Sequence, residues 1–293
     1  MIEVVECPIC ESTKFNPYLS VQDHSISKET FTIKQCSACS LRLSSPRPDD
    51  SDLPKYYESE DYVSHSDSTK GIINTIYQIV KKITLRKKVR LISGLTSGRK
   101  LLDIGCGTGD FLSSCKKNKW QVFGLEPDEK ARKRAKEKGL ETIQDSQYLF
   151  EEKANSYDVV TMWHVLEHVS DLNGYFKQLF TILKEDGHLI IAVPNPDSPD
   201  AKHYKSYWAA YDVPRHLFHF SKENLMDLAA KHNFKIKAIK PMVFDSYYVS
   251  MLSEKYKGGS FFNAIINGLI SNVKAFKNIN NSSLIYILSK NPK

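Results

Sequence analysis

Three glycines at alternate positions, preceded by an aspartate, form the stretch of this sequence best suited to chemistry. Asp103 lies in the apolar run 101–104, which predicts a short buried strand, and the apolar residues after the glycines predict a helix. A strand, a glycine turn and a helix in this order bind an adenosine-containing cofactor at the carboxyl end of the first strand of an α/β sheet. We expect contacts to that cofactor from Asp103, Gly105, Cys106, Gly107 and Gly109.

The charges around the turn indicate which cofactor it binds. Asp110 stands where a dinucleotide fingerprint has its third glycine. A pyrophosphate at a helix N-terminus is bound by bare N–H groups, and carboxylates repel it. S-adenosylmethionine (SAM) has no phosphate and carries an ammonium and a sulfonium, which carboxylates favour. Because Asp103 and Asp110 flank the turn, the sequence predicts SAM rather than NAD.

Glu126 ends the second predicted strand, 21 residues after Gly105. An acid at this point accepts hydrogen bonds from both ribose hydroxyls of an adenosine. Glu126 could instead only cap the helix that opens after Pro127, but its spacing from Gly105 favours ribose binding, with Pro127 beside it. Two residues at the exit of the third strand could contact the adenine edge: Asp145 and Ser146.

A second group of polar residues follows the predicted strand 157–163. His164, Glu167 and His168 are spaced i, i+3, i+4, so on a helix they would share one face. One interpretation is a catalytic base or a weak divalent-metal site, since this residue set is ligand-competent. The other is cofactor packing without chemistry. We expect His168 to face the substrate, with Glu167 beside it.

Two aromatic segments could contact the substrate. Residues 197–220 form a long loop where a short one would suffice, and long loops at the carboxyl edge of a sheet are usually functional. In this loop, the Arg215 guanidinium could bind an anionic group of the substrate, and the imidazole of His216 or His219 could remove a proton. The tyrosine-rich stretch 56–65 is either packed on a domain face or a lid. The candidates are Arg215, His216, His219, Tyr57 and Tyr62, with His216 a second possible base.

Four cysteines form two C-x2-C knuckles, separated by twenty-five residues. Tetrahedral zinc needs two such pairs of thiolates on tight turns. Two disulfides or four free thiols are the alternatives, and a reducing cytoplasm argues against disulfides. We therefore predict a small structural zinc ribbon over residues 1–45, with the ligands Cys7, Cys10, Cys36 and Cys39.

The alternation of strands and helices from residue 100 predicts an α/β, doubly wound, seven-strand Rossmann-like sheet over 95–293. Residues 46–94 then form a linker and a basic covering helix. The net charge of +7 permits anionic partners without requiring them. The ribbon has few basic and aromatic residues, which disfavours nucleic acid. Neither a signal peptide nor a membrane span is expected, so we predict a cytoplasmic protein; the sequence does not indicate its oligomeric state.

In order along the chain, these motifs resemble those of class I SAM-dependent methyltransferases. The similar stretches are 101–109, 124–127, 157–160, 165–169 and 183–191. The resemblance implies a seven-strand sheet whose last strand is antiparallel. It also implies SAM contacts at Asp103, Gly105 and Gly107, with Glu126 on the ribose, and it places Trp163 and His164 beside the methionine moiety.

Narrower resemblances concern the methyl acceptor. The two-knuckle ribbon before this domain is similar to bacterial sugar C-methyltransferases, and the segment 212–220 to methyltransferases of surface glycans and secondary metabolites. We therefore predict a small-molecule methyltransferase acting on a sugar, nucleotide-sugar or glycan intermediate. The Glu167-His168 pair also resembles quinone-pathway O-methyltransferases. RNA methylation, a non-catalytic SAM-binding protein and a nicotinamide oxidoreductase are further alternatives.

Overall fold

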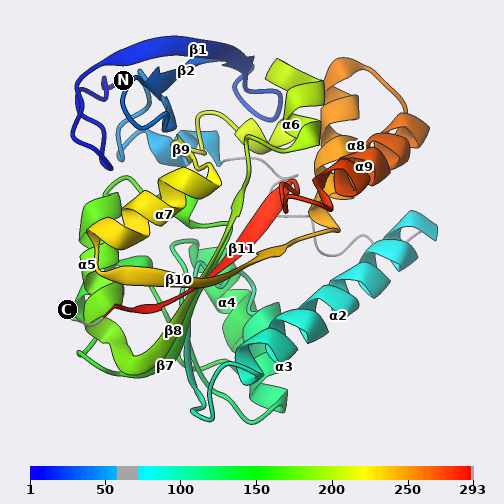
Figure 1. Ribbon diagram of the computed structural model, residues 1–293. Coiled ribbons are helices and arrows are strands. Elements are labelled where there is room, and N and C mark those ends of the chain that lie inside the picture. The colour runs from blue at the N-terminus through cyan, green and yellow to red at the C-terminus, as the bar shows by residue number, and fades with distance from the viewer. Residues whose placement is uncertain (58–71, 292–293) are drawn as a thin grey trace.

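The computed structural model describes residues 1–57 and 72–291, and Figure 1 shows one large sheet between helices, with a smaller sheet above it. The large sheet has seven strands in the order β10-β11-β8-β7-β4-β5-β6. β4, β5, β6, β7 and β8 pair in parallel, while β11 is antiparallel to both of its neighbours. The predicted seven-strand α/β fold with an antiparallel last strand is confirmed. Its strands are β4 Lys100–Ile104, β5 Gln121–Leu125, β6 Ile143–Gln144, β7 Tyr157–Trp163, β8 Leu183–Pro194, β10 Phe234–Pro241 and β11 Ser283–Lys290.

Alternate side chains of β4 enter two separate cores, so helices cover both faces of the sheet. Leu101 packs in a cluster with residues of α2, α3 and α4, whereas Leu102 packs in a cluster with residues of α5 and α7. This alternation follows from the twofold side-chain period of a strand. The helices are α2 Ile72–Ser93, α3 Asp110–Lys117, α4 Glu129–Glu137, α5 Leu172–Ile182 and α7 Lys222–Lys231.

The smaller sheet joins the N-terminal ribbon to the long loop that precedes α7. Its strand order is β1-β2-β3-β9, with every pair antiparallel. Arg42 of β3 pairs with His219 of β9, so the ribbon is completed by a strand from far along the chain (Figure 1). The predicted boundary of the zinc ribbon at residue 45 stays a prediction. The four-stranded sheet of the ribbon also includes β9, which lies far beyond that residue. The strands are β1 Phe15–Gln22, β2 Thr30–Cys36, β3 Arg42–Ser44 and β9 Phe218–His219.

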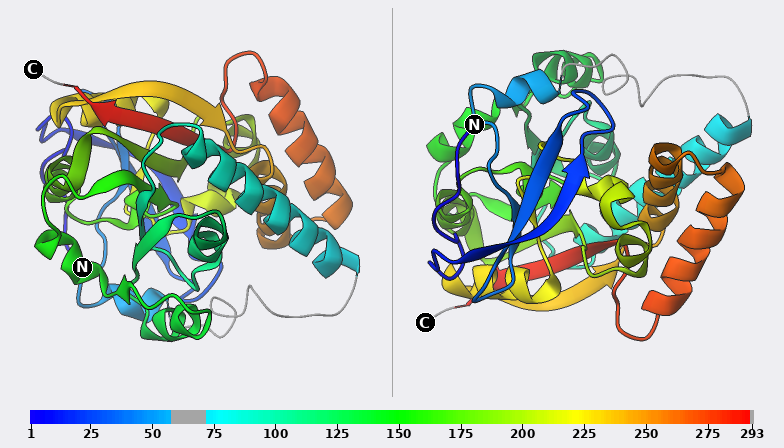
Figure 2. Two further views of the ribbon diagram at one scale, coloured as in Figure 1. Left: turned by 90° about the horizontal axis from the view of Figure 1, so that it is seen from below. Right: turned by 90° about the horizontal axis from the view of Figure 1, so that it is seen from above.

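Two helices lie between β10 and β11 and form a hairpin at one edge of the molecule, near α2 (Figure 2). Apolar residues at helical spacing over 260–277 predict the second, α9 Phe261–Ala275, whereas the sequence does not predict the first, α8 Asp245–Lys257. α6 Pro199–Tyr204 packs beside them. Short 3-10 turns complete the connections: η1 Leu53–Tyr56, η2 Ser146–Glu151, η3 Leu166–His168, η4 Lys205–Tyr207 and η5 Ala209–Tyr211.

Among the described residues, none of the helices combines the length and the apolar character needed to cross a membrane.

Candidate cofactor and catalytic site

The glycine turn between β4 and α3 faces the end of β5. Gly105, Gly107 and Gly109 have φ of 69°, 53° and 77°, in the left-handed region that glycine adopts without strain. The Gly107 N–H donates to a Glu126 carboxylate oxygen at 2.8 Å, and the other oxygen accepts from the Asp128 N–H at 3.0 Å. A Cβ added to Gly107 would meet nothing within 4 Å. The turn therefore borders open space beside the predicted ribose-binding acid, which fits an adenosine.

Asp103 is buried near the carboxyl end of β4. It accepts a hydrogen bond from the Thr161 hydroxyl of neighbouring β7 at 2.6 Å. Burial raises the pKa of Asp103 to about 7, although the Thr161 hydrogen bond and the nearby Lys88 ammonium oppose this rise. Asp103 thus changes charge near neutral pH, at the position expected to bind the cationic cofactor.

Asp110, at the start of α3, has partners that the sequence does not predict. Its carboxylate forms ion pairs with Lys81 of α2 and with Lys138, which caps the end of α4, each at 2.6 Å. Although burial opposes ionisation, these two lysines hold its pKa below the ordinary value. Its charge is therefore already balanced by the protein, so the preference for a cationic cofactor depends on Asp103 and Glu126 rather than on Asp110.

The predicted adenine-edge residues lie where β6 ends. Asp145 caps η2 by accepting from the Gln147 N–H, and its other oxygen pairs with Arg132 at 2.8 Å. Ser146 opens that turn, and Pro127 lies exposed after Glu126. The contacts of Asp145, Ser146 and Pro127 with adenosine stay predictions.

Three polar atoms at the end of β7 are buried without a hydrogen-bond partner in the described part of the chain. They are the Trp163 indole nitrogen and both carboxylate oxygens of Glu167. Glu167 nevertheless lies 3.4 Å from His164 Nδ1, whose Nε2 is 3.1 Å from Asp245. Burial alone would lower the pKa of His164, but the two carboxylates raise it to about 9. His164 is therefore positively charged at neutral pH.

The expectation that His164, Glu167 and His168 share one helical face is wrong. His164 has a φ of 57°, and the helix that follows is only the three-residue turn η3. His164 Nδ1 still lies 3.4 Å from a Glu167 carboxylate oxygen, because the left-handed residue turns the chain back, and ligand atoms of Glu167 and His168 lie within 4.8 Å of each other.

His168 has a defined tautomer. Its Nδ1 lies 3.0 Å from the Arg215 carbonyl oxygen and 2.9 Å from the Tyr57 hydroxyl. A carbonyl can only accept, so Nδ1 carries the proton and Nε2 keeps its lone pair. Burial, together with the nearby His216, lowers the pKa of His168 to about 4. His168 is therefore neutral at physiological pH and able to accept a proton.

His216 and Glu167 lie beside His168. The His168 and His216 rings are edge to face, with centroids 4.6 Å apart. His216 Nδ1 donates to the Ala210 carbonyl at 2.9 Å, and its Nε2 lies 4.0 Å from Glu167. Ligand atoms of these three residues lie within 4.8 Å of one another. The cluster could therefore hold a divalent cation or act as a base without one.

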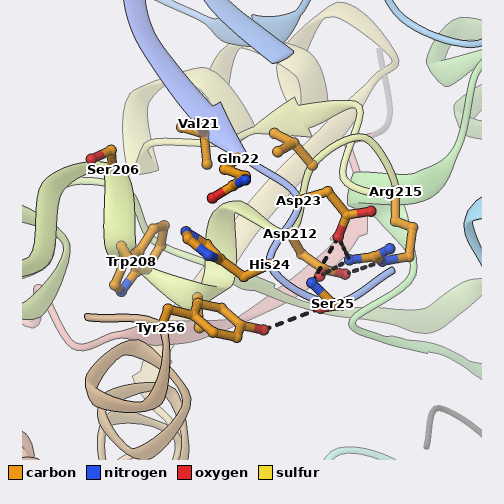
Figure 3. A pocket seen from close by; sticks show the side chains of 12 residues that line it. Val21, Gln22, Asp23, His24, Ser25, Ser206, Trp208, Asp212, Arg215 and Tyr256 are labelled. Carbon is orange, nitrogen blue, oxygen red and sulfur yellow. Dashed lines mark hydrogen bonds and ion pairs between the residues drawn. The ribbon is translucent and has the colours of Figure 1, made fainter. Parts of the chain in front are cut away.

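Arg215 is buried in the protein, where its guanidinium is paired with two carboxylates. Its side chain is 1% exposed and is held by Asp23, at 3.2 Å, and Asp212, at 2.6 Å. Figure 3 shows both carboxylates pointing at the guanidinium, beside a cavity of about 10 Å³, room for roughly one water. Its third partner is the Tyr56 carbonyl. The prediction that Arg215 binds an anionic group of the substrate is therefore corrected. Its guanidinium instead joins the ribbon to the long loop.

His219 lines a larger cavity of about 280 Å³, between the ribbon and the start of α7. It is 4% exposed, and its Nε2 has no hydrogen-bond partner among the described residues. Arg42, Asp197 and Glu223 line the same cavity. This arrangement suits a polar ligand, and substrate binding by His219 stays a prediction. Tyr57 contacts the histidine cluster, while Tyr62 lies outside the described residues.

The four predicted metal ligands come together in the ribbon. Cys7 and Cys39 have their sulfurs 3.5 Å apart, as do Cys10 and Cys36, and all four lie within 4.8 Å of one another. None of them is in a disulfide. The arrangement matches the four-thiolate donor set of structural zinc.

Comparison with known proteins assigns the main domain. Residues 77–239 match the family described as a methyltransferase domain. The chain belongs to this family. Together with the sheet order, this confirms the prediction of a class I SAM-dependent methyltransferase fold.

Curated relatives match only part of this methyltransferase. The ubiquinone biosynthesis O-methyltransferase of Acinetobacter baumannii (strain AYE) is 32% identical over 111 residues, covering 35% of this chain and 47% of that protein. The enzyme of the same name from Aliivibrio fischeri is 34% identical over 143 residues, covering 46% and 60%. The chain therefore spans about half the length of these relatives.

Solved structures resemble the methyltransferase in fold alone. Geranyl diphosphate C-methyltransferase from Streptomyces coelicolor A3(2) has a TM-score of 0.55 at 11% identity, covering 82% of this chain and 97% of that one. A SAM-dependent methyltransferase from Archaeoglobus fulgidus has a TM-score of 0.51 at 23% identity, covering 71% and 94%.

Sequence reasoning missed two charged residues of the methyltransferase site, Lys88 and Asp245. The Lys88 ammonium lies 4.0 Å from the centre of the Trp163 ring, and burial lowers its pKa to about 8. The seven-residue spacing of Lys81 and Lys88, which places both on one face of α2, is a signal that could have found Lys88. Asp245 starts α8, a helix that the sequence does not indicate.

Proposed function

We propose that this protein transfers the methyl group of SAM to a small molecule, with His168 as the base that deprotonates the acceptor. The observation that carries the proposal is the glycine turn facing Glu126 across adjacent parallel strands, with open space above Gly107. SAM would supply an electrophilic methyl group on its sulfonium: the acceptor atom would bond to the methyl carbon as the carbon–sulfur bond breaks, and S-adenosylhomocysteine would leave. The turn and Glu126 would hold the adenosine, and Asp103 would favour the cationic end.

The protein's further contribution is placement and proton removal. Holding an acceptor about 3 Å from the methyl carbon converts an encounter into a unimolecular step. His168 Nε2 would take the proton of a hydroxyl or an acidic C–H as the new bond to the methyl forms. Tyr57 and the Arg215 carbonyl support this role, because together they fix the orientation of the imidazole.

Two acceptor classes are in contention. The first is a sugar, nucleotide-sugar or glycan intermediate, and the polar cavity of about 280 Å³ around His219 has room for one sugar ring. The second is a phenolic hydroxyl of a quinone precursor, which the names of the curated relatives favour. The proposal also includes a structural Zn²⁺ at the four ribbon cysteines, in a reducing, cytoplasmic setting.

The direct test is transfer of a tritiated methyl from SAM to a panel of nucleotide sugars, quinone precursors, small phenols and RNA. The wild type is expected to label a small-molecule acceptor. The Glu126→Gln variant, assayed at a low SAM concentration, is expected to label none. Label in RNA alone, or in none of the panel despite tight SAM binding, would contradict the assignment. Calorimetry that compares binding of SAM with binding of NAD distinguishes a methyltransferase from the nicotinamide oxidoreductase alternative, which would bind NAD.

The base assignment has its own test. His168→Asn should lower kcat by about 100-fold or more and leave the Kd for SAM unchanged, because proton removal by a positioned base contributes about this much. His188→Asn, which alters a histidine bonded to the Leu95 carbonyl, is the matched control. Survival of kcat in His168→Asn would contradict the base assignment, and loss of wild-type kcat on removal of divalent cations would instead indicate a metal at the cluster of Glu167, His168 and His216.

A further inference from the structure

Helix α9 presents its large apolar side chains outward. The residues of α9 that are buried are all small: Ala264, Gly268, Ser271 and Ala275. The outward side chains include Phe262, 70% exposed, and Val273, 67% exposed, while Phe276, just after the helix, is 87% exposed. The complete exposed stripe is Phe261, Phe262, Ile265, Ile266, Leu269, Ile270, Val273 and Phe276.

This arrangement reverses the usual one, in which a helix buries its large apolar residues against the core. The small residues let α9 lie close to α8, where a Cβ on Gly268 would come within 2.8 Å of the Tyr247 ring. Packing against α8 therefore explains why the buried face of α9 consists of small residues, but it does not explain why the exposed face consists of large apolar residues. A contiguous exposed apolar surface of this kind marks an interaction site.

The charges around α9 indicate what it contacts. From Lys255 to Lys293 there is no aspartate or glutamate, whereas Lys255 and Lys257 end α8, Lys274 lies in the last turn of α9 and Lys277 follows it. A second copy of the chain packed against α9 would bring its own lysines close to these lysines, and the like charges would repel one another. A negatively charged surface would instead attract the lysines near α9. Helix α2, which lies near the α8–α9 hairpin in Figure 2, has further exposed basic residues: Lys82, Arg86 and Arg90.

We propose that α9 binds the surface of an anionic phospholipid bilayer, with its apolar stripe in the boundary between headgroups and acyl chains. An amphipathic helix with apolar and aromatic residues on one side and lysines around them has the composition of such interfacial helices. With 15 residues α9 is too short to span a bilayer, which needs about 20. This inference is independent of the proposed function, since it concerns binding rather than turnover.

The experiment is co-sedimentation of the full chain with phosphatidylcholine vesicles, with and without phosphatidylglycerol. Binding to the phosphatidylglycerol vesicles, weakened by salt, is expected. The triple variant Phe262→Gln, Leu269→Gln, Val273→Gln should lose about tenfold or more in partitioning. Lys274→Glu with Lys277→Glu should lose about fivefold per charge on anionic vesicles only. Met226→Gln, on an exposed residue of α7, is the control and should bind like the wild type.

Three outcomes would overturn the proposal: no vesicle binding by the wild type at low salt, undiminished binding by both α9 variants, or equal losses in the Met226→Gln control. A concentration-dependent dimer that the triple variant abolishes, without any vesicle binding, would assign the stripe to a second copy of the chain. Unchanged SAM calorimetry in each variant shows that it is folded.

Discussion

Glu126 connects the glycine turn to the start of α4, since one carboxylate accepts from the N–H groups of both Gly107 and Asp128. Glu126→Gln keeps the shape of the side chain but removes the charge that would hold two ribose hydroxyls. Hydrogen bonds to a charged group contribute about 1.5–3 kcal/mol, so the Kd for SAM should rise about 10- to 100-fold by calorimetry. Glu129→Gln, on an exposed acid three residues later, should leave the Kd unchanged; equal losses in the two variants would refute the ribose assignment.

Asp103 predicts a pH dependence of SAM binding. Its pKa is raised to about 7, so the carboxyl is neutral below that pH and charged above it. Binding of a cation should therefore strengthen as the pH rises, by about five- to tenfold between pH 6 and pH 7.5. This window lies below the pKa values of Lys88, about 8, and His164, about 9. Calorimetry over the window checks this, and a slope that persists in Asp103→Asn would assign the titration to another group.

The same raised pKa affects stability with the opposite sign. A carboxyl whose pKa is higher in the folded than in the unfolded state binds more protons when folded. Its contribution is therefore fully present below the unfolded value of about 4 and is lost as the pH rises through about 7. Asp103 thus contributes less to stability at the pH where it favours the cofactor.

At the scale of elements, the ribbon depends on its cysteines and on β9. Cys36→Ser should abolish binding of one zinc per chain, measured by metal analysis of the purified protein. Because β3 pairs with β9, amide hydrogen exchange at Phe218 and His219 should accelerate by about tenfold or more. Cys115→Ser, in α3, should keep both the metal and the protection. Metal loss without faster exchange would show that β9 is held independently of the metal.

The elements show how far sequence reasoning reaches. The pattern of apolar runs and glycines suffices for the seven strands, because local periodicity reports which side of a strand or helix is buried. The same reasoning makes Arg215 a candidate clamp for an anionic substrate group, since nothing local indicates that Asp23, far earlier in the chain, lies against it. Glu167 and His216 are proposed from residue type and from position along the chain, and their proximity depends on η3 and the long loop packing together.

At the scale of the whole molecule, the Arg215 side chain joins the ribbon to the long loop that carries β9. Its guanidinium contacts Asp23 of the ribbon and Asp212 of the long loop, with the Arg215 and Asp23 side chains at 1% and 0% exposure. Arg215→Met would leave a carboxylate buried without its partner, which costs about 3–5 kcal/mol. Urea unfolding should show this loss. Lys34→Met, which removes an exposed pair with Glu3, should cost about 1 kcal/mol or less; similar losses in both would refute the buried role.

The pairing of β3 with β9 also fixes an order of events during synthesis. Domains generally fold from the N-terminus as the chain emerges from the ribosome. Here Leu41 and Leu43 are buried in one cluster with Phe218, which is translated long after them. The N-terminal module, although it is made first, cannot complete its sheet until most of the catalytic domain has emerged. Its apolar residues must therefore remain uncovered, or be covered by a chaperone, until translation has passed residue 219.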